Sequence, residues 1–188
     1  YNQLEYFGVR GGTGLTFSEL THHHLKTLII ETGGLSGQAL RGIAHAELPA
    51  LEHLDIWIGR EDYGASVTLE DLQPFYTGNH LPNLKYLALR NSDMQDEIAE
   101  FMADAPVIER LDVLDMSMGT LTDQGAIALL SSTRIKSLKK LDISHNYCSQ
   151  AILKQFDTLS ASGVEVDTSE QLWDEFERDG WRFTAVGE

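Results

Sequence analysis

A spaced pattern of leucines recurs along this chain and constrains its fold more than any other feature of the sequence. The fullest copy runs from Leu138 to Asn146 and reads L-x-x-L-x-L-x-x-N. A short strand would carry the second and third apolar residues of this frame inward, since side chains alternate along a strand. Copies of the frame begin at six positions: Leu4, Leu25, Leu51, Leu84, Leu111 and Leu138. The intervals between these starts are 21, 26, 33, 27 and 27 residues, so the chain is predicted to be an array of similar units.

The segments that return from one strand to the next are predicted to be helices, because repeats of this length need a helical return limb. Apolar residues at helical spacing mark four of these limbs, in residues 36–44, 98–102, 125–130 and 151–159. Polar residues stand where helix caps are expected: Asp93, Thr122 or Asp123, and Ser149. A proline comes shortly before three of the strands, where a helix has to end: Pro49, Pro82 and Pro106.

The ninth and eleventh positions of the frame, which follow the strand, predict how the chain turns and which residue it buries there. At the ninth position of the frame, the amide of Asn146 can bond backbone groups that the curve leaves unpaired. The eleventh position is apolar in most copies, and Cys148 occupies it in the last one. Cys148 is therefore interpreted as a core residue, with a reactive thiol as the alternative. A single cysteine excludes an internal disulfide and fits a reducing compartment, so a cytoplasmic location is expected.

The frame from Leu4 to Val166 resembles the leucine-rich-repeat superfamily, and its helical return limbs look like the ribonuclease-inhibitor-like class. The resemblance implies an α/β fold, a right-handed curved leucine-rich-repeat solenoid with a parallel sheet on the concave face and helices on the convex face. It also implies a role in protein binding more often than an enzymatic one. The sequence departs from the pattern in two ways. The intervals are uneven, and glycines replace the ninth-position asparagine in four copies: Gly12, Gly33, Gly59 and Gly119. These departures suggest a divergent, bacterial-type member.

The predicted domain organisation is about six repeats plus a final strand in residues 1–167, followed by a C-terminal cap and tail in residues 168–188. Trp173, Phe176 and Trp181 are expected to cover the open end of the last repeat, near Val164 and Val166. A separate aromatic binding motif is the alternative. The third repeat is longer than the others at residues 58–68, which predicts a loop on the rim that is either a tolerated insertion or a ligand contact. The first residue is Tyr1 and not Met, so the chain is read as a fragment of a longer one.

The candidate binding site comes from the side chains that lie between the inward leucines, because these point to the concave face and stack into columns across the sheet. The middle column is predicted to contain Asp55, Asp115, Asp142 and Glu165, as either a solvated structural stripe or a binding surface. His53, Trp57 and Tyr86 are expected to cluster on adjacent strands as exposed anchors, with packing against the inserted loop as the alternative for these aromatics. The predicted protein-binding residues are His53, Asp55, Trp57, Tyr86, Arg90, Asp115 and Asp142.

Composition narrows the function classes. The formal net charge of −15 opposes binding to nucleic acid or to an anionic membrane, and favours either a basic protein partner or simple solubility. No catalytic residue, metal ligand or cofactor is predicted, and His22-His23-His24 is interpreted as a polar helix end before Leu25. The sequence therefore predicts a non-enzymatic protein-recognition module that uses the concave face. The alternative is a structural or regulatory arm of a larger protein whose active domain lies upstream of Tyr1.

Overall fold

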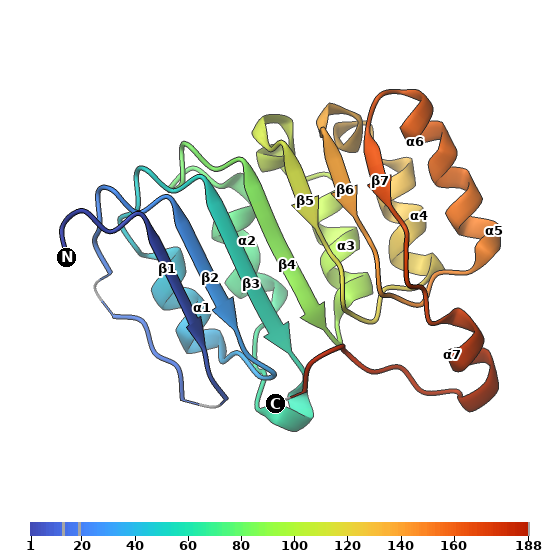
Figure 1. Cartoon of the computed structure of the whole chain (residues 1–188), viewed down its shortest axis with the longest axis horizontal. Coiled ribbons are helices and arrows are strands. Elements are labelled where there is room, and N and C mark those ends of the chain that lie inside the picture. The colour runs from blue at the N-terminus through green and yellow to red at the C-terminus, as the bar shows by residue number, and fades with distance from the viewer. Residues whose placement is uncertain (13, 19, 188) are drawn as a thin grey trace.

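A computed structural model of the chain describes residues 1–12, 14–18 and 20–187, so Glu188, the last residue of the predicted tail, lies outside the described residues. Within these residues, seven strands form one parallel sheet in the order of the sequence (Figure 1). The strands are β1 (Tyr6–Arg10), β2 (Thr27–Glu31), β3 (His53–Gly59), β4 (Tyr86–Ser92), β5 (Val113–Asp115), β6 (Lys140–Asp142) and β7 (Glu165–Asp167).

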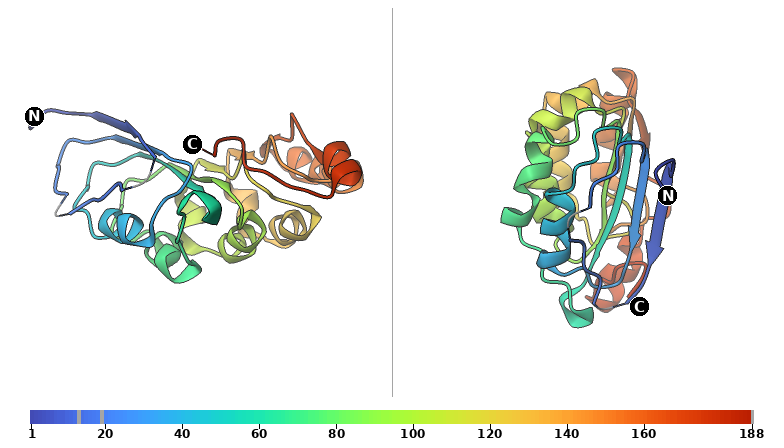
Figure 2. Two further views of the ribbon diagram at one scale, coloured as in Figure 1. Left: turned by 90° about the horizontal axis from the view of Figure 1, so that it is seen from below. Right: turned by 90° about the vertical axis from the view of Figure 1, so that its left-hand side faces the viewer.

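Helices connect the successive strands from β2 to β7. The α-helices are α1 (Gly37–Ala44), α2 (Leu69–Thr77), α3 (Gln95–Ala103), α4 (Asp123–Ser131), α5 (Gln150–Leu153), α6 (Asp157–Ala161) and α7 (Trp173–Asp179). Short 3-10 helices are η1 (Glu61–Tyr63), η2 (Pro106–Arg110), η3 (Arg134–Ser137) and η4 (Lys154–Phe156). The sheet lies on the concave side of a curved two-layer structure, and α1 to α6 cover its convex side (Figure 2). The predicted open α/β solenoid is confirmed. None of the described helices combines the length and the apolarity needed to span a bilayer.

The core follows from the register of the parallel strands. The fourth-position leucines pair in one continuous row from Leu28 to Leu141, and each is fully buried between sheet and helices. The same position in β1 holds Phe7, which pairs with Leu28 but remains 38% exposed. The described residues between β1 and β2 contain no helix, and the residues just before Leu25 form bends, so the predicted helix end at His22-His23-His24 is wrong.

Turns at the ends of the strands use specific residues. The side chain of Asn146 is fully buried, accepts a hydrogen bond from Leu121 N at 3.0 Å and donates to three backbone carbonyls at 3.0–3.1 Å. It therefore satisfies the backbone groups that the turn would otherwise leave unpaired, as predicted. Gly59 has a φ of +83°, and a Cβ there would lie 1.9 Å from the carbonyl oxygen of Gly33. Glycine is required at that turn because no side chain fits.

A chain of polar contacts links consecutive helices on the convex side. The Asp96 carboxylate in α3 accepts hydrogen bonds from the backbone and the hydroxyl of Thr122, the residue that caps α4. The Asp123 carboxylate in α4 does the same for Ser149, the cap of α5. Thr122 and Ser149 are therefore caps, as predicted. We call the contacts of these two aspartates the capping ladder.

Asp93 is not a cap, contrary to the prediction. The helix α3 begins after Met94 without a side-chain cap. The Asp93 carboxylate instead accepts a hydrogen bond from Glu61 N at 3.0 Å, at the start of η1 in the inserted loop. The insertion therefore provides a competing donor that the local sequence around Asp93 does not reveal.

Cys148 is expected to be inert in the folded protein. Its side chain is fully buried, and burial, together with the nearby charges of Asp123 and Asp96, raises the pKa of its thiol above the ordinary value of 9.0. Because the thiolate is the reactive form, Ellman's reagent should modify the native protein at least about 100-fold more slowly than the protein unfolded in urea. A native reaction rate equal to that in urea would restore the interpretation as a reactive thiol.

The C-terminal segment takes a path different from the predicted one. Helix α7 lies beyond the carboxyl ends of the last strands, and the chain then runs back along that edge towards β3 (Figure 1). Trp173 and Phe176 are half-buried, and Phe176 meets the ring of Tyr147 edge-on at 6.2 Å. Trp181 is 72% exposed, so its predicted packing over the last repeat is wrong. The reason is that the segment after α7 returns across the sheet edge instead of folding over β7.

Candidate functional site

Two rows of side chains cross the concave face because all seven strands pair in register. The first, which we call the amino row, contains Tyr6, Thr27, His53, Tyr86, Val113, Lys140 and Glu165. The second, the middle row, corresponds to the predicted middle column. It contains Gly8, Ile29, Asp55, Ala88, Asp115, Asp142 and Asp167. Every member of the amino row is at least partly exposed. With strands about 4.8 Å apart, the row extends over roughly 29 Å.

Glu165 belongs to the amino row and not to the middle row, which corrects the sequence prediction. The prediction placed Glu165 in the middle column, between Val164 and Val166 of the final strand. In the structure Val166 pairs with Leu141, the fourth position of the preceding copy. This places Asp167 next to Asp142 and Glu165 next to Lys140. Two valines two residues apart fit either register, and only the pairing of β7 with β6 distinguishes them.

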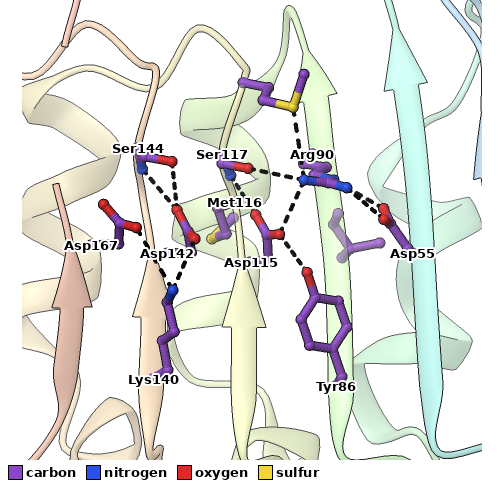
Figure 3. Close-up of polar contacts among 12 residues, drawn as sticks. Asp55, Tyr86, Arg90, Asp115, Met116, Ser117, Lys140, Asp142, Ser144 and Asp167 are labelled. Carbon is purple, nitrogen blue, oxygen red and sulfur yellow. Dashed lines mark hydrogen bonds and ion pairs between the residues drawn. The ribbon is translucent and has the colours of Figure 1, made fainter. Parts of the chain in front are cut away.

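The centre of the face is a cluster built on Arg90 (Figure 3). Its guanidinium holds both carboxylate oxygens of Asp55, with Nε at 3.0 Å and Nη2 at 2.6 Å, while Nη1 lies 3.3 Å from the carboxylate of Asp115. Both aspartates are only 3% exposed. Burial raises the pKa of Asp55 although Arg90 acts in the opposite direction. The cluster is therefore a largely buried ionic network, in which Arg90 and the two aspartates interact with each other instead of with water.

Trp57 is buried beneath this cluster, contrary to the prediction that it is an exposed anchor. Its ring is 8% exposed, and the Arg90 guanidinium lies over it at 5.1 Å from the ring centre. Arg90 pairs with Trp57 in the register of β3 and β4, so the long arginine side chain covers the indole. Trp57 and Asp55 are therefore both buried at the concave face, in contact with Arg90.

His53 and Tyr86 form the accessible aromatic pair of the face. Their rings stack at 3.8 Å with an interplanar angle of 7°. The Tyr86 hydroxyl donates a hydrogen bond of 2.5 Å to Asp115, which fixes the ring against the buried cluster. Burial is the main cause that lowers the pKa of His53 below its ordinary value of 6.5, which favours the neutral imidazole. The predicted residues His53, Tyr86, Arg90, Asp55 and Asp115 therefore lie together.

Tyr86→Phe is expected to lower the free energy of unfolding by about 1.5 kcal/mol, since it removes a hydrogen bond to a charged group. Burial and the Asp115 carboxylate raise the pKa of the Tyr86 phenol above its ordinary value of 10.0. The protonated phenol therefore contributes stability that is fully present below pH 10 and is lost as the pH rises through the raised pKa. Urea denaturation should show a gap between variant and unmodified protein that narrows above pH 10. Tyr6→Phe is the matched control because Tyr6 is exposed, and a gap that does not depend on pH would contradict the assignment.

Asp142 lies apart from this cluster, beside Lys140. The Lys140 ammonium lies 3.5 Å from Asp142, 3.6 Å from Glu165 and 3.7 Å from Asp167. The site predicted from the sequence did not include Lys140. A single cation between the acids of neighbouring strands was the available signal. The face therefore has a formal charge of −3, concentrated at its β6–β7 end. This counts the two cations Arg90 and Lys140 against five carboxylates: Asp55, Asp115, Asp142, Glu165 and Asp167.

Three acids of the middle row also have a structural role. In the last three repeats the sequence reads Asp-x-Ser, and each aspartate Oδ1 accepts the backbone N–H two residues later, at 2.9–3.1 Å. The pairs are Asp115 with Ser117, Asp142 with Ser144, and Asp167 with Ser169. This side-chain contact holds the turn that follows each strand. The acidic stripe is therefore largely committed to intramolecular contacts. Within the described residues, no group of three His, Cys, Asp or Glu side chains is arranged to hold a metal ion.

The fold and this face define an open repeat solenoid with an ordered concave surface. A family model described as Leucine Rich repeat matches residues 80–103 and 111–130. A crystal structure of a Bacteroides fragilis protein superposes with a TM-score of 0.76 at 30% identity, covering 82% of this chain and 44% of that one. The chain thus spans less than half the length of that protein. A comparison with curated proteins gives no significant match.

Residues 80–103 and 111–130 thus match leucine-rich repeats, and the two findings together support assignment of the chain to the leucine-rich-repeat superfamily. Leucine-rich repeats are generally protein-interaction modules, and proteins of this family are typically non-enzymatic.

Proposed function

We propose that this chain is a non-enzymatic module that recognises another protein with the concave face of its sheet, and that the amino row is the contact surface. The observation that carries the proposal is the register: seven side chains from seven strands are presented side by side, and all are accessible. An open, rigid row of this length suits a partner's helix or extended segment.

His53 and Tyr86 are the anchors of the proposed surface. Aromatic side chains that are accessible and already fixed lose little conformational entropy on binding, which is why they dominate binding energies at interfaces. Tyr86 is fixed by its hydrogen bond to Asp115, and His53 is fixed by stacking on Tyr86. The cluster of Arg90, Asp55 and Trp57 lies behind them as a support.

The two ends of the face differ in chemistry, which defines the partner further. The β1–β2 end carries Tyr6 and Ile29, whereas the β6–β7 end carries Glu165 and Asp167 around the single cation Lys140. A complementary partner places apolar side chains at the first end and a basic group at the second. The one cysteine, buried and free, supports a reducing compartment such as the cytoplasm.

A photo-crosslinking amino acid at Val113 tests the proposal, because Val113 lies in the centre of the amino row and is partly exposed. Ile127 on α4 is the matched control on the convex side, since it is 52% exposed. The partner should crosslink to the probe at Val113 and not to the probe at Ile127. Once the partner is identified in this way, His53→Ala should weaken its binding to the chain at least 10-fold. Crosslinking from Ile127 alone, or unchanged affinity of the His53 variant, would rule out this surface.

A second candidate, a structural or regulatory arm of a larger protein, is supported by β1. Phe7 and Leu4 are each 38% exposed, whereas the corresponding core residues of β2 are buried. Such an edge suits packing against further protein. Hydrogen exchange on the natural polypeptide tests this candidate. If the β1 amides are more protected in the natural polypeptide than in this chain, the result supports the structural or regulatory arm. Equal exchange of these amides in the two samples contradicts it.

A further inference from the structure

The segment after α7 lies along the carboxyl rim, the edge of the sheet at which the strands end. Helix α7 ends at Asp179 and is followed by Gly180, whose φ of +72° turns the chain back. The segment from Trp181 to Gly187 then passes the ends of β5 and β4 and reaches η1 (Figure 1). We call these seven residues the tail and the surface beneath them the rim seat.

The rim seat binds the tail mainly through its backbone. The hydroxyl of Tyr147 bonds both the N–H and the carbonyl of Phe183, at 2.8 and 3.0 Å. The carbonyl of Met118 accepts Ala185 N at 3.0 Å. The side-chain amide of Asn91 bonds both the N–H and the carbonyl of Val186, each at 2.9 Å. Such contacts hold any extended backbone and do not depend on the sequence of the occupant.

One side chain of the tail is recognised specifically. Arg182 donates from Nη1 to the carbonyl of Thr120 at 2.8 Å and lies 3.4 Å from the Asp96 carboxylate, whose side chain is 11% exposed. Trp181 is not recognised in this way, since it is 72% exposed, and Phe183 is 55% exposed with one face of its ring under the guanidinium of Arg60 at 5.0 Å from the ring centre. Thr184 is the one buried residue in the described tail.

These contacts suit an extended backbone and are tolerant of its side chains. The amide of Asn91 is fully buried beneath the tail and bonds only the backbone of Val186, so water has to replace both bonds when no peptide lies over it. The tail itself buries little apolar surface, so few contacts that depend on its own sequence hold it in place. Asp96 adds a negative charge that selects for an arginine.

We propose that the rim seat is a binding site for an extended segment of a partner protein in which an arginine is followed two residues later by a small side chain. The tail is its internal occupant and leaves when the partner binds. Gly180 acts as the hinge, because its backbone conformation is readily accessible to glycine and a Cβ there would meet no neighbouring atom. This site lies on the rim and is separate from the amino row, so it does not depend on the proposed function of the concave face.

The test uses the full chain and a fluorescent peptide with the sequence of residues 181–187, followed by anisotropy. In the unmodified chain the tail competes, so binding of the peptide should be weak. Arg182→Ala in the chain loosens the internal tail, and the affinity for the unmodified peptide should rise at least 10-fold. Trp181→Ala is the matched control and should leave the affinity unchanged, because that side chain is exposed. Adding Asn91→Ala to Arg182→Ala should reverse the gain, whereas adding Asn83→Ala on the opposite rim should not.

A second measurement covers the case in which the Arg182 variant does not fold. A protease site placed directly after Gly180 in the otherwise unmodified chain is cleaved after folding, and labelled peptide is added in excess. The labelled peptide should replace the cleaved tail while the circular dichroism of the chain stays unchanged. A tail that does not exchange, or an Arg182 variant that binds the peptide no better than the unmodified chain, overturns the proposal and makes the tail a fixed part of the fold.

Discussion

Arg90→Ala is expected to lower the free energy of unfolding by about 3 kcal/mol at pH 7, because it leaves two buried carboxylates without their cation. The Arg90 side chain is 20% exposed, whereas those of Asp55 and Asp115 are 4% and 5% exposed. The Arg90 side chain also covers Trp57, so some packing is lost together with the charge. Urea denaturation of the purified variant measures the effect.

The loss should depend on pH in a defined direction. Burial already raises the pKa of Asp55 above its ordinary value of 3.8 in the presence of Arg90, and removal of the cation raises it further. A carboxyl whose folded pKa is raised contributes stability that is present below its unfolded pKa and is lost as the pH rises through the folded value. The gap between the variant and the unmodified protein should therefore be larger at pH 7 than at pH 4.5.

Lys139→Ala is the control for this prediction. Lys139 forms an ion pair with Asp112 at 3.1 Å, but its side chain is 76% exposed, so its loss should change stability by less than about 0.5 kcal/mol. If both variants lose the same small amount, the Arg90 cluster behaves as a surface ion pair and does not support the aromatic pair above it.

Asn146→Ala is expected to destabilise the protein by about 3 kcal/mol and to lower the melting temperature by about 6–12 °C. The substitution leaves Leu121 N and the carbonyls that Asn146 bonds without this partner in a fully buried turn. Each unsatisfied buried group costs about 1–3 kcal/mol, reduced where the turn can relax. Differential scanning calorimetry measures both quantities.

Asn83→Ala provides the matched control because Asn83 makes one exposed side-chain bond, to the carbonyl of Pro49 at 2.8 Å. Its removal should cost less than about 1 kcal/mol. A melting temperature for the Asn146 variant within about 2 °C of that of the control would show that water replaces the amide and that the turn does not depend on it.

Local sequence was sufficient for the features whose cause is local. The spacing of the leucines predicted the strands because a residue is inward or outward by its position in the frame. Thr122 and Ser149 were predicted as caps because a cap bonds its own helix. The Asn146 amide was predicted in its role since it bonds the turn that contains it, although its bonds to Leu121 and Met116 cross to the preceding repeat.

The predictions that failed depend on residues distant in the sequence. Trp57 is buried because a side chain from the next strand lies over it. The register of β7 depends on its pairing with β6, which two alternating valines did not determine. The path of the tail depends on the contact between Asn91 and Val186, 95 residues apart in the chain. The aspartates of the candidate site were found because they recur at one position, but their intramolecular partners were not.

The capping ladder gives the assembly of this solenoid a direction. Asp96 lies in α3 and bonds the start of α4, and Asp123 lies in α4 and bonds the start of α5. Each of these two helices therefore prepares the first turn of the one that follows it. Starting a helix is its costly step, so order in this part of the chain spreads most readily from the amino-terminal to the carboxyl-terminal repeats. The ribosome releases the repeats in that same order, so each new repeat can fold on a preceding one that is already in place.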